Sequence, residues 1–310
     1  MNTIRINKYL SNAGVCSRRE ADQYTDAGRI TINGTLVSTG ERISPDAEVC
    51  LDGKPIQQEK QQVLLLFYKP RGIVCSTKKQ RQETTVTEFL DYPLRIYPVG
   101  RLDKESEGLL LLTNQGDLVN RIMRAGNYHE KEYLVTVNKE VSSEFIQKMA
   151  SGVPVLDTVT RKCFLEKTGK NTFRIILTQG LNRQIRRMCA YFGYEVISLK
   201  RIRIMNLTLG NLKPGEYRTI RPDEQKQLEQ MLKNSSNETV TGGNYGNSPA
   251  ANEKAGKNIK QSSKSLLSGR PGDHGQQGVR FSVRSAGKTG KGDRNHTGRQ
   301  PHGKRRLRSR

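Results

Sequence analysis

The chain has 310 residues, enough for two small domains and a tail. It carries 53 Lys and Arg against 30 Asp and Glu, a net charge of +23 at pH 7 and an isoelectric point near 10.0. Such a charge predicts an anionic partner, nucleic acid before an anionic membrane. A membrane protein is not expected, because no apolar span approaches the length of a transmembrane helix and the N-terminus lacks the apolar core of a signal peptide.

The excess of positive charge is not confined to the C-terminal end. Residues 240–310 hold 16 basic and 3 acidic residues, so residues 1–239 still hold 37 and 27. The five cysteines are odd in number, widely spaced and form no CxxC pair, which favours a reducing compartment, the cytoplasm, over a disulfide framework or a zinc site. With four histidines, three of them beyond residue 270, a histidine metal centre is not expected either.

The first 60 residues predict a compact unit of two helices followed by a small curled sheet. Residues 5–13 have an apolar face at helical spacing. Ser17 and Glu20 form a capping box, so a second helix should begin after Ser17. Asn33-Gly34 lies between two short β-rich runs and predicts a tight hairpin.

Residues 7–37, NKYLSNAGVCSRREADQYTDAGRITINGTLV, resemble an S4 RNA-binding domain throughout. The resemblance implies that the two helices dock against structured RNA by shape and phosphate contacts. The basic residues expected to make these contacts are Arg5, Lys8, Arg18 and Arg19. From the residues alone, a solvated helical face is the better explanation for any one of them.

A polar linker at residues 57–62 separates this unit from a second one. Residues 63–68, VLLLFY, form a continuous apolar run and predict a buried strand. Lys69 begins a turn, because Pro70 and Gly72 follow it. A basic turn that ends a strand accounts fully for Lys69.

The most informative stretch is residues 99–118, VGRLDKESEGLLLLTNQGDL. Its four consecutive leucines between a glycine and an asparagine predict a short buried strand, which anchors the charged loop before it. Arg101 and Lys104 surround Asp103 with positive charge, which keeps the carboxylate ionised and would attract a polyanion. A solvated loop residue paired with its basic neighbours is the structural alternative for Asp103.

Residues 100–118 resemble the signature of the pseudouridine synthases, in the branch of the ribosomal small-subunit enzyme. In this family the aspartate of the Arg-Leu-Asp motif is the nucleophile, and the resemblance implies this role for Asp103. KPRGIVCST at residues 69–77 resembles the first motif of the same branch, which shapes the floor of the active site. The family resemblance implies an α+β catalytic domain on a mixed, mainly antiparallel sheet with an RNA cleft across it; periodicity alone supports only α+β.

KEYLVTV at residues 131–137 alternates like a strand. A tyrosine in a strand is usually core packing, but in this family the tyrosine of a Lys-x-Tyr pattern lies against the target uracil, which implies that role for Tyr133. GLNRQIRRM at residues 180–188 predicts a helix capped by Asn182, with arginines near an N-terminus that favours anions. It resembles the third motif of the family, whose Gln-x-Arg arginine pairs with the catalytic aspartate, and this implies the same role for Arg186.

Making pseudouridine breaks the bond between ribose and a uracil nitrogen, rotates the base and rejoins it through carbon. This chemistry needs a nucleophile, a base for the carbon-bound proton and an electrostatic clamp, which the resemblance assigns to Asp103, Tyr133 and Arg186. Arg101 would fill the space that the flipped-out uridine leaves. The other residues expected to contact RNA are Leu102, Lys104, Arg183, Gln184, Ile185 and Arg187. Neither a metal nor an organic cofactor is expected.

The sequence therefore predicts an α+β protein in three parts: an S4 domain (αα-β) at residues 1–60, a pseudouridine synthase catalytic domain at residues 61–232 and a basic tail at residues 233–310. Residues 222–232 predict the last helix. Beyond them the chain is rich in Gly, Ser, Asn, Lys and Arg with almost no large apolar residues, so we predict disorder there.

The expected activity is pseudouridine formation in 23S ribosomal RNA near the peptidyl-transferase centre, by a monomer that binds an RNA stem-loop. A transfer-RNA uridine as a second substrate stays open, as does the atom that Asp103 attacks. The alternative is a non-catalytic S4-domain ribosome assembly factor; a DNA-binding protein is disfavoured, because nothing resembles a reading helix with its dimer interface. Asp103→Asn separates the enzyme from the assembly factor, because only catalysis depends on that carboxylate.

Overall fold

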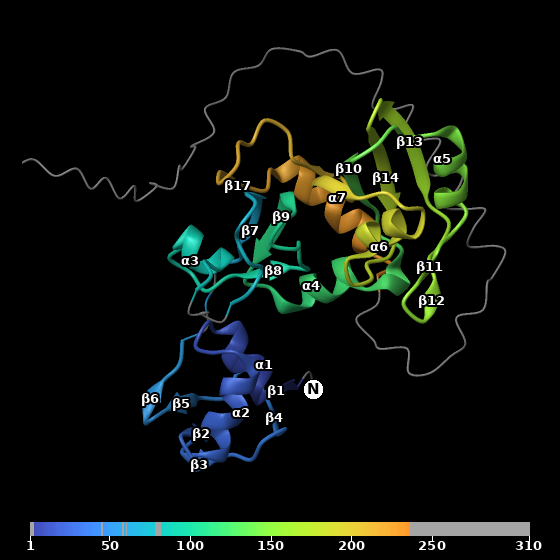
Figure 1. The fold of residues 1–310 in the computed structure, drawn as a ribbon. Helices are drawn as coiled ribbons and strands as arrows, with labels where there is room; N and C mark the ends of the chain where they lie inside the picture. Colours follow the sequence, from blue (N-terminus) through green and yellow to red (C-terminus); the bar gives the residue numbers. More distant parts are fainter. Residues whose placement is uncertain (1–2, 45, 58, 60, 78–81, 236–310) are drawn as a thin grey trace, which may run out of the picture.

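The computed structural model describes residues 3–235, apart from residues 45, 58, 60 and 78–81. These residues form a small N-terminal unit, blue in Figure 1, and a larger part built on one long sheet. The predicted disorder of the tail concerns residues outside this range, except for residues 233–235. Within the described range, no helix is both long and apolar enough to cross a membrane.

The N-terminal unit has the predicted two helices and small sheet. Its elements are α1 (Ile6–Asn12), α2 (Arg18–Asp26), β1 (Ile4–Arg5), β2 (Ile30–Ile32), β3 (Thr35–Leu36), β4 (Arg42–Ile43), β5 (Val49–Leu51) and β6 (Lys54–Pro55). The Ser17 hydroxyl caps α2 as predicted, accepting a hydrogen bond from the Glu20 amide at 3.2 Å, while the Ser17 amide donates to the Glu20 carboxylate at 2.7 Å. The predicted hairpin turns at Asn33-Gly34, where both residues have the positive φ that a type I′ turn requires.

In the described residues, the larger part contains a nine-stranded sheet with the order β13-β14-β10-β15-β9-β7-β17, to which β8 adds beside β9 and β16 beside β15. The strands are β7 (Leu64–Lys69), β8 (Tyr97–Val99), β9 (Glu107–Thr113), β10 (Lys131–Val137), β13 (Phe164–Gly169), β14 (Thr172–Leu177), β15 (Val196–Ile204), β16 (Leu207–Thr208) and β17 (Tyr217–Thr219), with a separate hairpin of β11 (Pro154–Val155) and β12 (Thr158–Val159). Of these strand pairs, only β9 with β15 is parallel, so the predicted mixed, mainly antiparallel sheet is confirmed. We call this parallel pair the seam, because it joins two antiparallel halves.

The half that contains β7 and β9 is covered on both faces. Leu66 and Leu111 face a core closed by α4 (Gly116–Met123) and α7 (Pro222–Leu232). Leu65 and Leu110 face the opposite core, closed by α3 (Val86–Leu90). A strand buried on both faces has continuous apolar residues, which explains the uninterrupted leucines of the sequence. A short 3-10 helix, η1 (Ala125–Asn127), follows α4.

The other half packs β10, β14 and β15 against α5 (Ser143–Ala150) and α6 (Gln184–Tyr191). The predicted cap of α6 is wrong. Its N-cap is Arg183, in the left-handed conformation with φ 51° and without a side-chain capping bond, rather than Asn182. The Asn182 carbonyl instead accepts a hydrogen bond from Arg187 Nε at 3.1 Å, so Asn182 lies one residue outside the helix and binds its first turn from there.

The two parts of the molecule meet where α1 approaches α4 (Figure 1). Lys8 Nζ lies 2.7 Å from Asp117 Oδ2 across this junction. A cleft of about 570 Å³ lies beside the pair, and its lining includes Asn12 of α1, Arg121 of α4 and Leu232 of α7.

Candidate active site

Asp103 lies in a loop that is held at its ends and from the side. The loop follows β8 and runs directly into β9. The Leu102 amide donates to the Cys75 sulfur at 3.3 Å, and the Gly72 amide donates to the Lys104 carbonyl at 2.8 Å. The segment at residues 69–77 therefore supports the loop, as expected for the floor of a site. The Asp103 side chain is 32% exposed, so its carboxylate can reach a bound molecule.

Two guanidinium groups from the start of α6 face this carboxylate. Arg183 Nη1 lies 3.9 Å and Arg186 Nε 4.0 Å from Asp103 Oδ2. Arg186 is anchored by hydrogen bonds from Nη1 to the Val196 carbonyl at 3.0 Å and from Nη2 to the Ser106 hydroxyl at 3.4 Å, whereas its buried Nε has no partner. A shift of about 1 Å would turn the Arg186–Asp103 contact into a charge-assisted hydrogen bond. The fold thus brings together the predicted nucleophile and its predicted clamp.

Tyr133 lies in β10, directly opposite Arg201 of β15. Its partly exposed ring packs between the core of the α5–α6 half and the core under α3, and the Arg201 guanidinium carbon lies 6.0 Å from the ring centre. Lys131, two residues earlier, is only 4% exposed and donates to the His129 carbonyl at 3.3 Å. Burial, with a smaller contribution from the nearby Arg201 charge, lowers the pKa of Lys131 to about 8.

Lys69 has a different position from the one its sequence suggests. It is the last residue of β7 rather than an exposed turn residue, and it is fully buried. Its ammonium donates to the Pro70 carbonyl at 2.9 Å and to the Ser106 carbonyl at 2.8 Å, which ties β7 to the Asp103 loop. Burial lowers the pKa of Lys69. The sequence offers no signal for this, because a lysine after an apolar run is usually solvated.

The other predicted RNA contacts around the loop and α6 divide by exposure. The exposed residues are Arg101, Lys104, Arg183 and Arg187. The buried ones are Leu102, Gln184 and Ile185. The Gln184 carbonyl oxygen accepts the Leu181 amide at 3.0 Å, and Leu102 and Ile185 lie in the apolar cores, so these three side chains stabilise the fold instead of offering groups to RNA. Two exposed residues already have anionic partners, since Lys104 pairs with Glu83 and Arg183 with Glu105.

The four basic residues of the N-terminal unit that are expected to contact RNA fall into two pairs, one exposed and one at the junction with α4. Arg5 and Arg19 are exposed. Lys8 pairs with Asp117, and the guanidinium of the exposed Arg18 lies beside Gly116, so both are at the junction with α4. An RNA that followed all four residues would therefore also run along α4.

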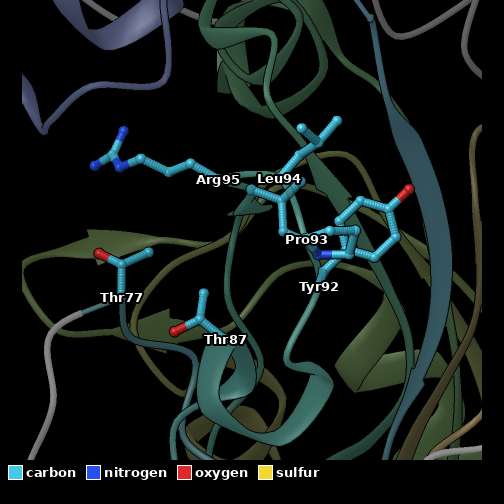
Figure 2. A pocket seen from close by; sticks show the side chains of 7 residues that line it. Thr77, Thr87, Tyr92, Pro93, Leu94 and Arg95 are labelled. Carbon is cyan, nitrogen blue, oxygen red and sulfur yellow. The ribbon is translucent and has the colours of Figure 1, made fainter.

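A cavity of about 260 Å³ lies away from this chemistry. Its lining consists of Thr77, Thr87, Tyr92, Pro93, Leu94, Arg95 and Ile96. Figure 2 shows the Arg95 side chain extending away from the Tyr92 ring, with the two threonines on another side of the hollow. None of the predicted site residues lines it; Asp103, Tyr133 and Arg186 lie in the loop before β9, in β10 and in α6.

The fold thus brings a carboxylate and two guanidinium groups together in front of β9, in a molecule whose N-terminal unit also carries exposed arginines, and this distribution of positive charge suits a polyanionic substrate. Comparison with known proteins agrees. A family model described as RNA pseudouridylate synthase matches residues 63–191, and an S4 domain model matches residues 4–49. The chain belongs to the family of RNA pseudouridine synthases.

Relatives of this chain carry the same family name. It is 49% identical over 238 residues to the dual-specificity RNA pseudouridine synthase RluF of Escherichia coli (strain K12), covering 76% of this chain and 82% of that one. It is 33% identical to ribosomal large subunit pseudouridine synthase B of Bacillus subtilis (strain 168), covering 75% and 98%. A solved structure described as a pseudouridylate synthase, 28% identical, matches 74% of this chain and 99% of its own with a TM-score of 0.54. The protein is therefore an isomerase acting on RNA, and the non-catalytic alternative is not favoured.

Proposed function

We propose that this protein converts one uridine of 23S ribosomal RNA, in a stem-loop near the peptidyl-transferase centre, to pseudouridine. The name of the Bacillus subtilis relative specifies the large ribosomal subunit, which supports a 23S target. The Escherichia coli relative is named a dual-specificity enzyme, which supports a second RNA substrate, for which we propose a transfer-RNA uridine. The strong positive charge and the matched S4 domain suit such partners.

The observation that carries the mechanism is the approach of Arg186 Nε to Asp103 Oδ2, at 4.0 Å with no other partner for that nitrogen. Asp103 is the nucleophile toward the sugar or the ring. Arg186 fixes the direction of this carboxylate once the contact tightens around RNA. Tyr133 lies against the uracil and receives the proton that leaves carbon.

The reaction balances without an added reagent, because uridine and pseudouridine are isomers. Asp103 forms a transient bond to the sugar or the ring, and this bond breaks again before the product leaves. The bond from ribose to the ring nitrogen breaks and a bond from ribose to ring carbon forms. Tyr133 relays the carbon-bound proton, taking it up as its own phenolic proton passes to solvent, while the freed nitrogen gains a proton from solvent. The uridine must leave its stack, which costs a few kcal/mol. Arg101, exposed at the edge of the loop, stacks in the vacated space.

The proposed division of labour follows the two parts of the molecule. Residues 1–60 dock on RNA secondary structure and residues 61–232 carry out the reaction, in a cytoplasmic monomer. The exposed residues proposed to hold RNA phosphates are Arg5, Arg19, Lys104, Arg183 and Arg187, with Lys8 and Arg18 at the junction.

The test is pseudouridine mapping along ribosomal and transfer RNA from cells that lack the protein, complemented with wild type, Asp103→Asn or Asp157→Asn. Asp157 is a matched control, because it is an exposed aspartate on the β11–β12 turn. We expect one 23S site to lose its mark, and wild type and Asp157→Asn but not Asp103→Asn to restore it. Restoration by Asp103→Asn would exclude the nucleophile, and a mark lost only from transfer RNA would exclude the 23S target.

A further inference from the structure

Arg201 is the largest fully buried side chain of the described residues, at 1% exposed, and none of the carboxylates in that part of the chain forms an ion pair with it. Its Nε donates to the Leu109 carbonyl at 2.7 Å and its Nη1 approaches the Arg101 carbonyl at 3.5 Å, while Nη2 has no partner. A buried guanidinium without a counter-ion lowers stability. Stability therefore does not explain its presence.

The two carbonyls that Arg201 binds bracket Asp103. Arg101 stands two residues before the nucleophile, and Leu109 is in β9, where the loop has become strand. Because one rigid, planar group contacts both ends, the guanidinium holds the span of the loop at a fixed length. The backbone is held as well, since Gly108 pairs with Arg201 across the seam.

A β-bulge gives Arg201 this direction. In the β10–β15 pair, Glu132 lies opposite Arg203, but the register shifts and Tyr133 lies opposite Arg201. Regular alternation would place Arg201 and Arg203 on one face of β15. The bulge separates them: Arg203 pairs with Glu130 and Glu132, whereas Arg201 turns to the Tyr133 ring and the Asp103 loop. Bulges often serve to redirect a side chain beside an active site.

We propose that Arg201 is a positioning residue that sets Asp103 relative to Tyr133. It contacts both ends of the loop that carries the nucleophile, and its guanidinium lies against the ring on the neighbouring strand. It touches no reacting atom, and it acts through the two groups that do. This inference rests on the roles proposed above for Asp103 and Tyr133.

The experiment compares Arg201→Lys and Arg201→Gln with wild type on 23S ribosomal RNA extracted from cells that lack the protein. Single-turnover rates at saturating RNA and RNA affinities are measured separately. A misplacement near 1 Å costs about 100-fold in rate, so we expect that loss in Arg201→Gln. Arg201→Lys should recover part of the rate, because one ammonium can still bind one carbonyl. RNA affinity should stay within about twofold, because docking uses other residues.

Arg203→Lys is the matched control, because Arg203 is on the same strand, two residues away, and its guanidinium binds Glu130 and Glu132 instead of the loop. We expect it to lower the melting temperature and keep the wild-type rate. If Arg201→Gln is too unstable to purify, the comparison of Arg201→Lys with Arg203→Lys tests the positioning role by itself.

The inference is overturned if Arg201→Lys turns over as fast as Arg203→Lys, if both slow equally, or if affinity falls while the saturated rate holds. Asp103→Asn in the same assay separates a failure of the proposed mechanism from a failure of the positioning role alone. An active Asp103→Asn removes the proposed mechanism and this inference with it. An inactive Asp103→Asn beside a fully active Arg201→Lys removes the inference alone.

Discussion

Lys69, Lys131 and Arg201 are three buried cations, and each donates a hydrogen bond to at least one backbone carbonyl. Lys69 and Arg201 bind the Asp103 loop, and Lys131 lies near the Arg201 charge. Burial penalises their charged forms. The charges of Lys69 and Arg201 make the floor of the site positive, which favours a bound polyanion. The cost of this arrangement is measurable at Lys131.

Lys131→Met should stabilise the protein at neutral pH. Below pH 8 the ammonium is charged in both the folded and the unfolded state, so its burial penalty is constant. Between pH 8 and 10.5 the folded state has released a proton that the unfolded state still binds, so the wild-type free energy of unfolding rises relative to the variant. The 2.5-unit pKa difference corresponds to about 3 kcal/mol over that window.

Urea unfolding of both proteins from pH 6.5 to 10.5 checks this expectation. Subtracting the two curves removes the groups that titrate in both proteins. A stability difference that does not change with pH would show that Lys131 has an ordinary pKa.

At the scale of single residues, the sequence predicts a site role for those that belong to recognisable motifs. Asp103 and Arg186 follow from the motifs around them, and the structure brings them together. Lys69 and Arg201 were missed for physical reasons. A lysine that ends an apolar run and an arginine within the alternating run LKRIRI are typical of solvated strand edges, and only tertiary contacts bury them.

The seam sets a steric limit on the element scale. Gly108 has φ +105°, and a Cβ there would lie 2.2 Å from the Arg201 carbonyl oxygen. Gly108→Ala combines an unfavourable backbone angle with a clash against another strand, neither of which a side-chain rotation can relieve. We expect a loss of about 3 kcal/mol in the free energy of unfolding.

Gly126→Ala is the control for this substitution, because Gly126 has an ordinary backbone angle and open space around its Cβ position. Thermal and urea unfolding of both variants measure the difference. Equal stability of Gly108→Ala and Gly126→Ala would mean that the two strands separate freely at the seam.

The elements that the sequence predicts well are those with local causes. The Ser17 capping box and the Asn33-Gly34 turn involve residues three apart or fewer, and both form as predicted. The start of α6 depends on the left-handed Arg183, and the β15 bulge depends on pairing with β10. Neither has a local signal, so propensity arguments misplace the first and miss the second.

On the scale of the whole molecule, the link between its two parts is weakly held. The Lys8–Asp117 pair is largely solvated, and such pairs contribute about 1 kcal/mol or less. RNA that contacts both parts would therefore help to fix their relative arrangement. Phosphate contacts spread over both parts also predict an affinity that falls steeply with salt.

Removing residues 240–310 should reduce that salt dependence. These residues carry 16 of the 53 basic side chains, and every described helix and strand remains intact in the shortened chain. We expect a shallower plot of log affinity against log salt and an unchanged single-turnover rate at saturating RNA, because the reacting groups lie elsewhere. Filter binding between about 50 and 200 mM salt measures the slope. An unchanged slope would show that the tail makes no phosphate contact.

The pairing of β9 with β15 also sets the point during synthesis at which the catalytic site can form. Arg201 and Leu109 are 92 residues apart, and Arg186 and Ser106 are 80 apart, yet each pair must meet to shape the site. Contacts this distant in the chain form late, because the entropy of closing a long loop is lost before the contacts themselves can stabilise the structure. On the ribosome the Asp103 loop cannot reach its final position until β15 has emerged. The N-terminal unit is free to fold before then. Catalytic activity thus reports a late, long-range step of folding, whereas RNA docking reports an early and local one.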